Sequence, residues 1–329
     1  MKKIKLIATG GTISAQGKDR LDMKDYQTGV YSGEDLLQKV PEINEIAEVA
    51  IVQLANFSST CMKSSHWLEL QAMVNRALNE DSYDGVVVTH GTNTLEETAY
   101  FLHLTMNSNK PVVCVGAQRP STAIGSDAIS NLFNAIRVAV DEKSTGKGVL
   151  VVSNNDINCA REVAKISTYR LETFQSGELG FLGYIDPDDT IHYYRSPVRK
   201  HTVQSIFAKT SAIKLPHVAI VYSYAGVDGD LIRFISNSKK YSGIVIAGTG
   251  AGRCSPEESA ALKEAVESGM VVVRSRRVHE GRVVPIDSFN EFACVTADNL
   301  SPQKSRILLM LALTLTDSLS DIQEIFNEY

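Results

Sequence analysis

The sequence predicts an α/β protein, with a doubly wound, mostly parallel sheet in a larger N-terminal domain and a smaller C-terminal α/β domain. Three observations support this prediction. Short runs rich in Val and Ile are nearly continuous in apolar residues, as in strands buried on both faces of a parallel sheet. Amphipathic stretches of helical period lie between these runs. A polar break separates two regions that each alternate between strand and helix patterns.

Eight segments have the pattern of buried strands, because each is short and mostly β-branched. We expect strands at Ile4–Ala8, Val49–Leu54, Gly85–Thr89, Pro111–Val115, Gly148–Ser153, Val218–Tyr222, Gly243–Ala247 and Met270–Arg274.

Helices are predicted between these strands, in stretches where apolar residues recur every three to four positions. His66–Asn79, Leu95–Met106 and Asp127–Glu142 show this period. A further helix is predicted to begin after Ser255, because Ser255 and Glu258 have the spacing of a capping box and Pro256 occupies the first helical position.

The domain boundary is predicted from a break between about residues 186 and 215. This stretch is polar, rich in Tyr, Arg, Lys and His, and has no clear apolar period, whereas the strand and helix patterns resume at Val218. We therefore expect an N-terminal domain at 1–190, a linker at 191–215 and a C-terminal domain at 216–329. The 329 residues suffice for two domains of ordinary size.

Composition excludes several classes of function. A formal net charge of -5 provides no basic field for nucleic acid or an anionic membrane surface. The five cysteines are odd in number and widely spread, which favours reduced thiols over a disulfide framework. The apolar run after the first residues is too short for a secretory signal, and the run Ile307–Leu313 is far shorter than a membrane span. We expect a cytoplasmic protein.

Two threonine-bearing segments are the strongest indication of a site. Thr9–Ile13 follows the strand-like stretch Ile4–Ala8, and Thr89–Thr94 follows the strand-like stretch Val86–Val88. Ligands bind at the carboxyl ends of strands in open α/β sheets. Two hydroxyls placed there by glycine-containing turns are typical of a nucleophile site.

Thr12 requires a group that removes its proton, because a threonine hydroxyl is otherwise a poor nucleophile. The stretch 16–31 follows directly, is rich in Gly, Asp and Lys, and offers Tyr26 and Tyr31 as phenols on a potential lid. The alternative is that Thr12 is a turn residue after a glycine pair. Position alone leaves both interpretations open.

Thr92 has a potential partner in Lys165, far along the chain. A lysine in the sequence Arg161–Lys165 is usually a solvated surface residue. A buried lysine with a lowered pKa would instead deprotonate a hydroxyl or a water. Spacing does not decide between these alternatives.

Other chemistries lack their motifs. The seven histidines show no metal-ligand spacing, and we expect His90 to be a hydrogen-bonded structural imidazole. Neither a dinucleotide fingerprint nor the Gly-x-Ser-x-Gly motif of α/β-hydrolases occurs in the sequence. We expect a reaction that uses no metal and no cofactor.

Together these residues give the chain a resemblance, from end to end, to the bacterial-type L-asparaginase/glutaminase family. The matching stretches are short, but they occur in the family's order, which makes the resemblance specific. They are Thr9–Ile13, Val88–Glu97, Gly116–Ser121, Arg161–Lys165, Arg199–Thr202 and Ser301–Lys304.

The resemblance implies an amidohydrolase that converts L-asparagine to L-aspartate and ammonia. It also implies a homotetramer in which a neighbouring subunit completes each active site. Thr12 would be the nucleophile, Tyr26 the lid phenol, and Thr92 with Lys165 the second hydroxyl–amine pair. Ser59 would bind the substrate α-carboxylate, and the carbonyl of Ala117 would receive the amide nitrogen.

The chain departs from the family pattern around the substrate α-amino group. Asn93 replaces the usual Asp that binds the α-ammonium, and Thr60 replaces a Gln or Glu that touches it. Arg253 matches an Asn that reaches the site from the neighbouring subunit, and Asp287 is the nearest match to the partner's acidic contact. A pocket with less negative charge would hold a free ammonium less well.

Three interpretations follow from this resemblance. The first is an asparaginase in which Asn93 is tolerated. The second is an amidohydrolase of the same family that acts on an asparagine derivative with a substituted or uncharged α-nitrogen. The third is a non-catalytic homologue that binds amides, against which the presence of Thr12, Tyr26, Thr92 and Lys165 argues.

Overall fold

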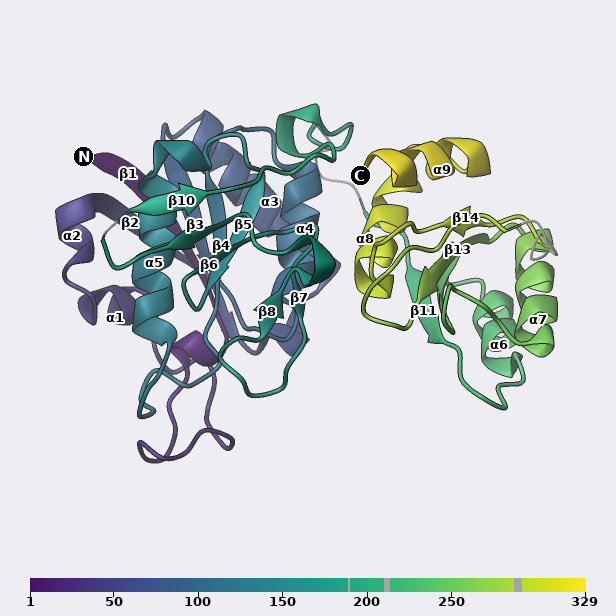
Figure 1. The fold of residues 1–329 in the computed structure, drawn as a ribbon, viewed down its shortest axis with the longest axis horizontal. Coiled ribbons are helices and arrows are strands. Elements are labelled where there is room, and N and C mark those ends of the chain that lie inside the picture. Colours follow the sequence, from purple (N-terminus) through teal and green to yellow (C-terminus); the bar gives the residue numbers. More distant parts are fainter. Residues whose placement is uncertain (189, 210–213, 287–291) are drawn as a thin grey trace. The chain divides into compact units, whose positions relative to one another are not determined.

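The computed structural model describes residues 1–188, 190–209, 214–286 and 292–329, and the chain divides into two compact units, Met1–Ala212 and Ile213–Tyr329 (Figure 1). The predicted α/β class is confirmed in both. All eight predicted strands are present, with ends that differ by a few residues. None of the described helices has the length and apolar character that crossing a bilayer requires.

The N-terminal unit contains an eight-stranded sheet in the order β10-β9-β6-β5-β4-β3-β1-β2. The five strands predicted in this unit, β1 to β5, pair in parallel, and β6, β9 and β10 extend the sheet in antiparallel pairing. The strands are β1 (Lys2–Gly10), β2 (Ala47–Phe57), β3 (Gly85–Thr89), β4 (Val112–Val115), β5 (Val149–Ser153), β6 (Asp156–Cys159), β9 (Gly183–Ile185) and β10 (Ile191–Tyr193).

The antiparallel strands are absent from the sequence prediction. β5 turns into β6 through Asn154 and Asn155, whose φ angles of 53° and 67° are those of a two-residue hairpin turn of type I′. β10 begins the segment predicted as a linker, 191–215, and pairs with β9. These strands contain three or four residues each, which is too short to show an alternating pattern.

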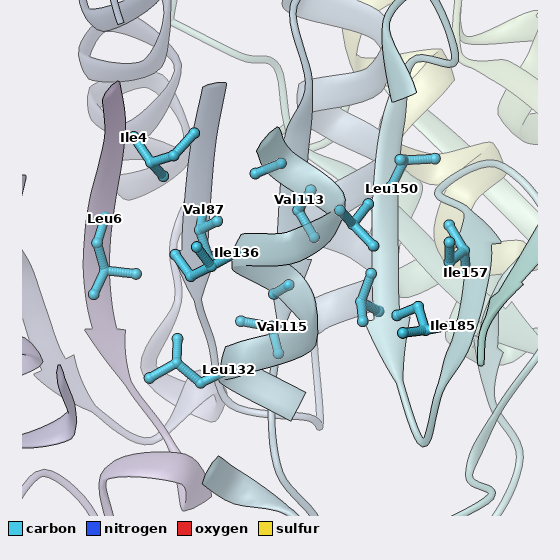
Figure 2. Packing of buried hydrophobic residues seen from close by; sticks show 14 of the residues in the cluster. Ile4, Leu6, Val87, Val113, Val115, Leu132, Ile136, Leu150, Ile157 and Ile185 are labelled. Atoms are coloured by element: carbon cyan, nitrogen blue, oxygen red, sulfur yellow. The ribbon is translucent and has the colours of Figure 1, made fainter. Parts of the chain in front are cut away.

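Helices cover both faces of this sheet. The helix α5 packs Leu132 and Ile136 onto strand residues such as Val113, within a cluster that also includes side chains of α1 and α2 (Figure 2). No residue of α3 or α4 belongs to this cluster, and these two helices pack on each other through the rings of Trp67 and Phe101. The helices are α1 (Gly33–Gln38), α2 (Ile43–Ile46), α3 (Ser64–Asn79), α4 (Leu95–Thr105) and α5 (Ala128–Val140), with 3-10 turns at Thr12–Ser14, Ser59–Cys61, Glu142–Ser144, Gly177–Leu179 and Thr202–Gln204.

The strand order reverses direction between β1 and β3. From β1 the chain moves outward to β2, whereas β3, β4 and β5 follow on the other side of β1. Ala8 pairs with Thr89, so the two strands end level with each other. Such a topological switch point opens a crevice at the carboxyl edge of the sheet. The two threonine segments emerge from these two strands.

The loops after β1 and β3 touch through glycine backbones. A Cβ atom built on Gly11 would lie 2.2 Å from the Cα of Gly91, and Gly11 has a φ of +87°. A Cβ built on Gly91 would lie 2.8 Å from the Oγ of Ser59. Both positions therefore require glycine, and this contact sets how closely the two threonine loops approach.

A buried hydrogen-bond chain fixes the loop after β3. The indole of Trp67 donates to the hydroxyl of Thr98 at 2.9 Å, and Thr98 is 2.9 Å from Nε2 of His90. Nδ1 of His90 lies 2.8 Å from the carbonyl oxygen of Gly91, which can only accept. Nδ1 therefore carries the proton and Thr98 donates to Nε2. The expected structural role of His90 is confirmed, and burial lowers the pKa of its imidazole to about 4.

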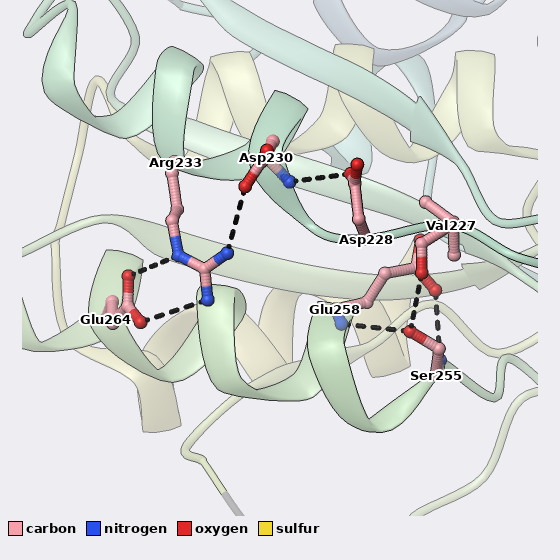
Figure 3. Close-up of polar contacts among 7 residues, drawn as sticks. All are labelled: Val227, Asp228, Asp230, Arg233, Ser255, Glu258 and Glu264. Carbon is pink, nitrogen blue, oxygen red and sulfur yellow. Dashed lines mark hydrogen bonds and ion pairs between the residues drawn. The ribbon is translucent and has the colours of Figure 1, made fainter.

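In its described residues, the C-terminal unit contains a four-stranded parallel sheet and four helices. Ser255 caps α7 as predicted, because its hydroxyl accepts from the amide of Glu258 and the Glu258 carboxylate accepts from the amide of Ser255 (Figure 3). Arg233 pairs with Glu264 between α6 and α7. The elements are β11 (Val218–Tyr222), β12 (Gly243–Gly248), β13 (Val271–Arg276), β14 (Val295–Thr296), α6 (Asp230–Asn237), α7 (Pro256–Glu267), α8 (Pro302–Ala312) and α9 (Leu319–Glu328). A separate two-stranded sheet in the N-terminal unit joins β7 (Ala164–Lys165) and β8 (Phe174–Gln175).

Gly11→Ala is expected to destabilise the protein by more than the strain of a positive φ. Gly11 has a φ of 87° and a ψ of -168°, a region essentially restricted to glycine, so a side chain there costs about 1–3 kcal/mol. The clash with Gly91 adds about 1–3 kcal/mol of overpacking. Gly146→Ala is the matched control, because Gly146 has a φ of +74° and open space where a Cβ would lie. Urea unfolding measures both losses, and equal losses would contradict a tight contact at Gly11.

Stability should fall as the pH decreases from about 6.5 to about 4, because His90 stays neutral in the folded protein while the unfolded chain takes up a proton. The loss attributable to His90 is about 3 kcal/mol over this window. In His90→Gln the decrease in Tm over this window should be smaller. Exposed His279 provides the control, since His279→Gln should leave the decrease unchanged. The same pH dependence in His90→Gln and the parent would contradict this account.

Candidate active site

Thr12 begins a tight turn directly after the glycine pair. The amide of Gly11 donates to the carbonyl of Phe57 at the end of β2, which bends the chain out of β1. Thr12 is 8% exposed, and its hydroxyl lies 3.1 Å from the hydroxyl of Tyr26. A threonine hydroxyl with a phenol within hydrogen-bond distance is the arrangement that an activated nucleophile requires.

The segment that carries Tyr26 folds back over Thr12. Gln16 and Gln27 pair as a two-residue bridge, with both N···O distances at 2.9 Å, and the amide of Tyr31 donates to the carbonyl of Ser14. The ring of Tyr31 lies under the amine of Lys39 at 3.3 Å, and Tyr31 packs against the α5 cluster. Of the two phenols that the sequence offers, Tyr26 therefore lies at Thr12.

Thr92 and Lys165 lie together, although 73 positions separate them in the sequence. The amine of Lys165 donates to the hydroxyl of Thr92 at 2.7 Å and to Oδ1 of Asn93 at 3.0 Å. The three side chains therefore form one hydrogen-bonded cluster at the end of β3. Lys165 is half-buried, so the interpretation as a solvated surface lysine is wrong.

Two features hold Lys165 in place. It lies on β7, where Lys165 pairs with Phe174 of β8. Its backbone amide donates to the carboxylate of Glu96 in the first turn of α4, at 2.5 Å. Burial lowers the pKa of the Lys165 amine, and the negative charge of Glu96 opposes this shift in part. The balance favours the neutral amine more than in a solvated lysine.

Ser59 and Thr60 lie in a 3-10 turn after β2. Ser59 is 3% exposed, and its buried hydroxyl has no hydrogen-bond partner among the residues that the structure describes. That hydroxyl lies close to Gly91, because a Cβ atom added to Gly91 would be 2.8 Å from it. The carbonyl of Ser59 accepts from the hydroxyl of Thr94 at 2.9 Å, which ties this turn to the second threonine loop. Thr60 is exposed and bonds to Ser58.

The turn that carries Ala117 is fixed by one carboxylate. Asp127 accepts from the amides of Gln118 and Arg119 at 2.9–3.1 Å and from the side chain of Asn131 at 3.0 Å. Asn131 also donates to the carbonyl of Gly116. Ala117 itself is 1% exposed and follows β4, the strand next to β3.

Arg253 lies in the C-terminal unit, in a short turn after β12. Its backbone forms a bridge with Thr249, with both N···O distances at 2.8 Å, and its side chain is exposed. Asp287 lies outside the described residues. In the described part of the chain, no group of three or more His, Cys, Asp and Glu side chains is arranged to hold a metal ion.

No pattern in the sequence indicates that Glu96 and Asp127 contribute to the site. Glu96 is followed by Glu97 in the first turn of a helix, where acidic residues are common because they favour the helix dipole. Asp127 has the position of an ordinary residue before a helix. The contact of Glu96 with Lys165 spans 69 positions, and those of Asp127 with the turn after Ala117 span eight and nine. No spacing rule predicts the longer contact.

Comparison with known proteins identifies the family of the chain. The family model "Asparaginase, N-terminal" matches residues 3–199, and "Glutaminase/Asparaginase C-terminal domain" matches residues 217–326. L-asparaginase 2 of Bacillus subtilis is 43% identical over all of this chain and 87% of its own length. A probable periplasmic L-asparaginase of Haemophilus influenzae is 40% identical, covering 100% of this chain and 93% of the relative.

A solved structure gives the same result for the fold. The probable cytoplasmic L-asparaginase of Campylobacter jejuni superposes with a TM-score of 0.95 at 38% identity, over the full length of both chains. The two family models together span most of the sequence, and their order matches the order of the two units. The chain therefore belongs to the bacterial-type L-asparaginase/glutaminase family.

Proposed function

We propose that this enzyme hydrolyses L-asparagine to L-aspartate and ammonia, with Thr12 as the nucleophile. The observation that carries the proposal is the pairing of each loop hydroxyl with an activating group. Thr12 lies 3.1 Å from the hydroxyl of Tyr26, and Thr92 lies 2.7 Å from the amine of Lys165. Both pairs lie where β1 and β3 end, and the named relatives are L-asparaginases.

In the first half of the reaction, Oγ1 of Thr12 attacks the carbonyl carbon of the side-chain amide. The Thr12 proton passes to Tyr26 while the Tyr26 proton passes to the amide nitrogen, which leaves as ammonia. An acyl ester remains on Thr12. The backbone amides of Thr12 and Thr92 are proposed to hold the developing oxyanion, at about 3–4 kcal/mol for each donor.

In the second half, the neutral amine of Lys165 removes a proton from a water molecule held at the hydroxyl of Thr92. The water oxygen bonds to the acyl carbon, the bond to Oγ1 of Thr12 breaks, and Thr12 recovers a proton from Lys165. Burial supports this role because it lowers the pKa of Lys165 and so enlarges the neutral fraction near neutral pH.

The remaining predicted residues are proposed to bind substrate. The buried hydroxyl of Ser59 would bind the α-carboxylate, since it has no hydrogen-bond partner in the described part of the molecule. The carbonyl of Ala117 would receive the amide nitrogen. Thr60 and Asn93 would contact the α-carbon substituents, and Arg253 would do so from a neighbouring subunit.

We also propose a homotetramer that works in the cytoplasm. The family resemblance supports the tetramer, and the five free cysteines suit a reducing compartment. Light scattering after size exclusion would test the tetramer, and cell fractionation would test the compartment. A monomer with full activity would contradict a site completed by a neighbouring subunit.

Thr12→Ala should lower kcat for ammonia release from L-asparagine by about 10³-fold or more, because it removes the proposed nucleophile. Ser14→Ala is the control, since Ser14 lies in the same turn with a buried hydroxyl that has no partner among the described residues. It should retain parental kcat. A fully active Thr12→Ala enzyme would contradict the assignment.

Glu96→Gln should move the acid limb of the kcat profile to lower pH, because Lys165 is proposed to act in the second half of the reaction, after ammonia has left. The amide keeps an acceptor for the backbone of Lys165 but removes the negative charge that raises its pKa, so the neutral base persists to lower pH. Glu97→Gln controls for the loss of a carboxylate from the same helical turn. If the acid limb of Glu96→Gln stays at the parental pH while its Tm falls, Glu96 has only a structural role.

A further inference from the structure

The hydrogen bond from Lys165 fixes which side of the Asn93 amide faces the site. The amine of Lys165 donates to the amide oxygen of Asn93, Oδ1, at 3.0 Å, so the oxygen side of the amide faces Lys165. The two N–H groups on Nδ2 remain, and within the described residues they donate to no other group. The side chain is exposed. Asn93 therefore offers hydrogen-bond donors to whatever occupies the site.

Among the described residues, the hydrogen-bond partner of the Asn93 side chain is Lys165, which adds no negative charge next to the Asn93 donors. Lys165 bonds to both Thr92 and Asn93, and the carboxylate that acts on it, Glu96, accepts from its backbone amide at 2.5 Å. Ser59 contributes a hydroxyl, and Thr60 bonds to Ser58. An ammonium next to Asn93 would meet the N–H donors of its amide, which repel it.

We infer that Asn93 selects substrates by the group next to its donors, and that the enzyme favours carboxamides with an acceptor or no charge there over those with a free ammonium. This inference rests on the proposed function, because it assumes that the scissile amide lies at Thr12. In asparagine the α-carbon is only two bonds from the amide carbonyl carbon. Its substituents therefore reach the neighbouring residues of the same loop cluster.

Three substrates that share one scissile carboxamide test the inference. L-asparagine carries an α-ammonium, N-acetyl-L-asparagine carries an acyl oxygen at that nitrogen, and succinamate lacks the nitrogen. The parent should hydrolyse at least one of the last two with a kcat/KM about tenfold above that for L-asparagine, the scale of one hydrogen bond to a charged group. If the acetyl group is too large to fit the site, succinamate still tests the inference, because it lacks the charged nitrogen and adds no bulk.

Asn93→Asp should reverse this preference. A carboxylate accepts from an ammonium and repels an acyl oxygen, so the ratio of kcat/KM for L-asparagine to that for succinamate should rise by about 10-fold to 100-fold. The new charge also acts on Lys165, but this effect is common to all three substrates and cancels in the ratio. Asn93→Ala, which removes the donors without adding charge, should raise that ratio by less than Asn93→Asp does.

Asn79→Asp is the matched control, because it makes the same change on an exposed residue at the end of α3. Its ratio should equal that of the parent. An unchanged ratio in a folded Asn93→Asp enzyme would overturn the inference, as would a parent that prefers L-asparagine tenfold over both analogues. If none of the three amides is hydrolysed by the parent, the proposed function fails instead, and the ratio is not defined.

Discussion

The contact between the backbones of Gly11 and Gly91 is the constraint on which the candidate site depends. Parallel pairing of β1 with β3 brings both strand ends to one level, but it leaves the loops free to diverge. The two backbones approach so closely that only glycine fits at these positions. A Cβ atom added to Gly11 would lie 2.2 Å from the Cα of Gly91. Thr12 and Thr92, each one residue farther along, are positioned by this contact.

Lys165 connects the electrostatics of the site to the fold. Its amine reaches Thr92 because β7 and α4 hold its backbone, the latter through the Glu96 carboxylate. Burial makes the amine a better base, and Glu96 limits how far its pKa falls. Asn93 contributes an amide dipole to the same amine without adding charge. The base strength of Lys165 is therefore set by its burial and by the carboxylate of Glu96, and its amine also contacts Asn93, the residue proposed to select the substrate.

Much of the fold could be predicted from the sequence, because parallel strands buried on both faces are nearly continuous apolar runs. The antiparallel extension could not, since β9 and β10 contain three residues each and show no period. The two threonine loops were predictable from glycines after strands. The link from Thr92 to Lys165 depends on tertiary structure, and it was expected only from family resemblance. The contact of Glu96 with Lys165 could not be predicted, because acidic residues are common in the first turn of a helix.

The most direct test of the central claim is to find which residue carries the acyl group. The enzyme would be mixed with L-asparagine, quenched in acid within milliseconds, digested with trypsin and analysed by mass spectrometry. The account predicts an aspartyl ester on the peptide Leu6–Lys18, localised by fragmentation to Thr12. An ester on Thr92, or turnover with no acylated peptide at any quench time, would contradict it.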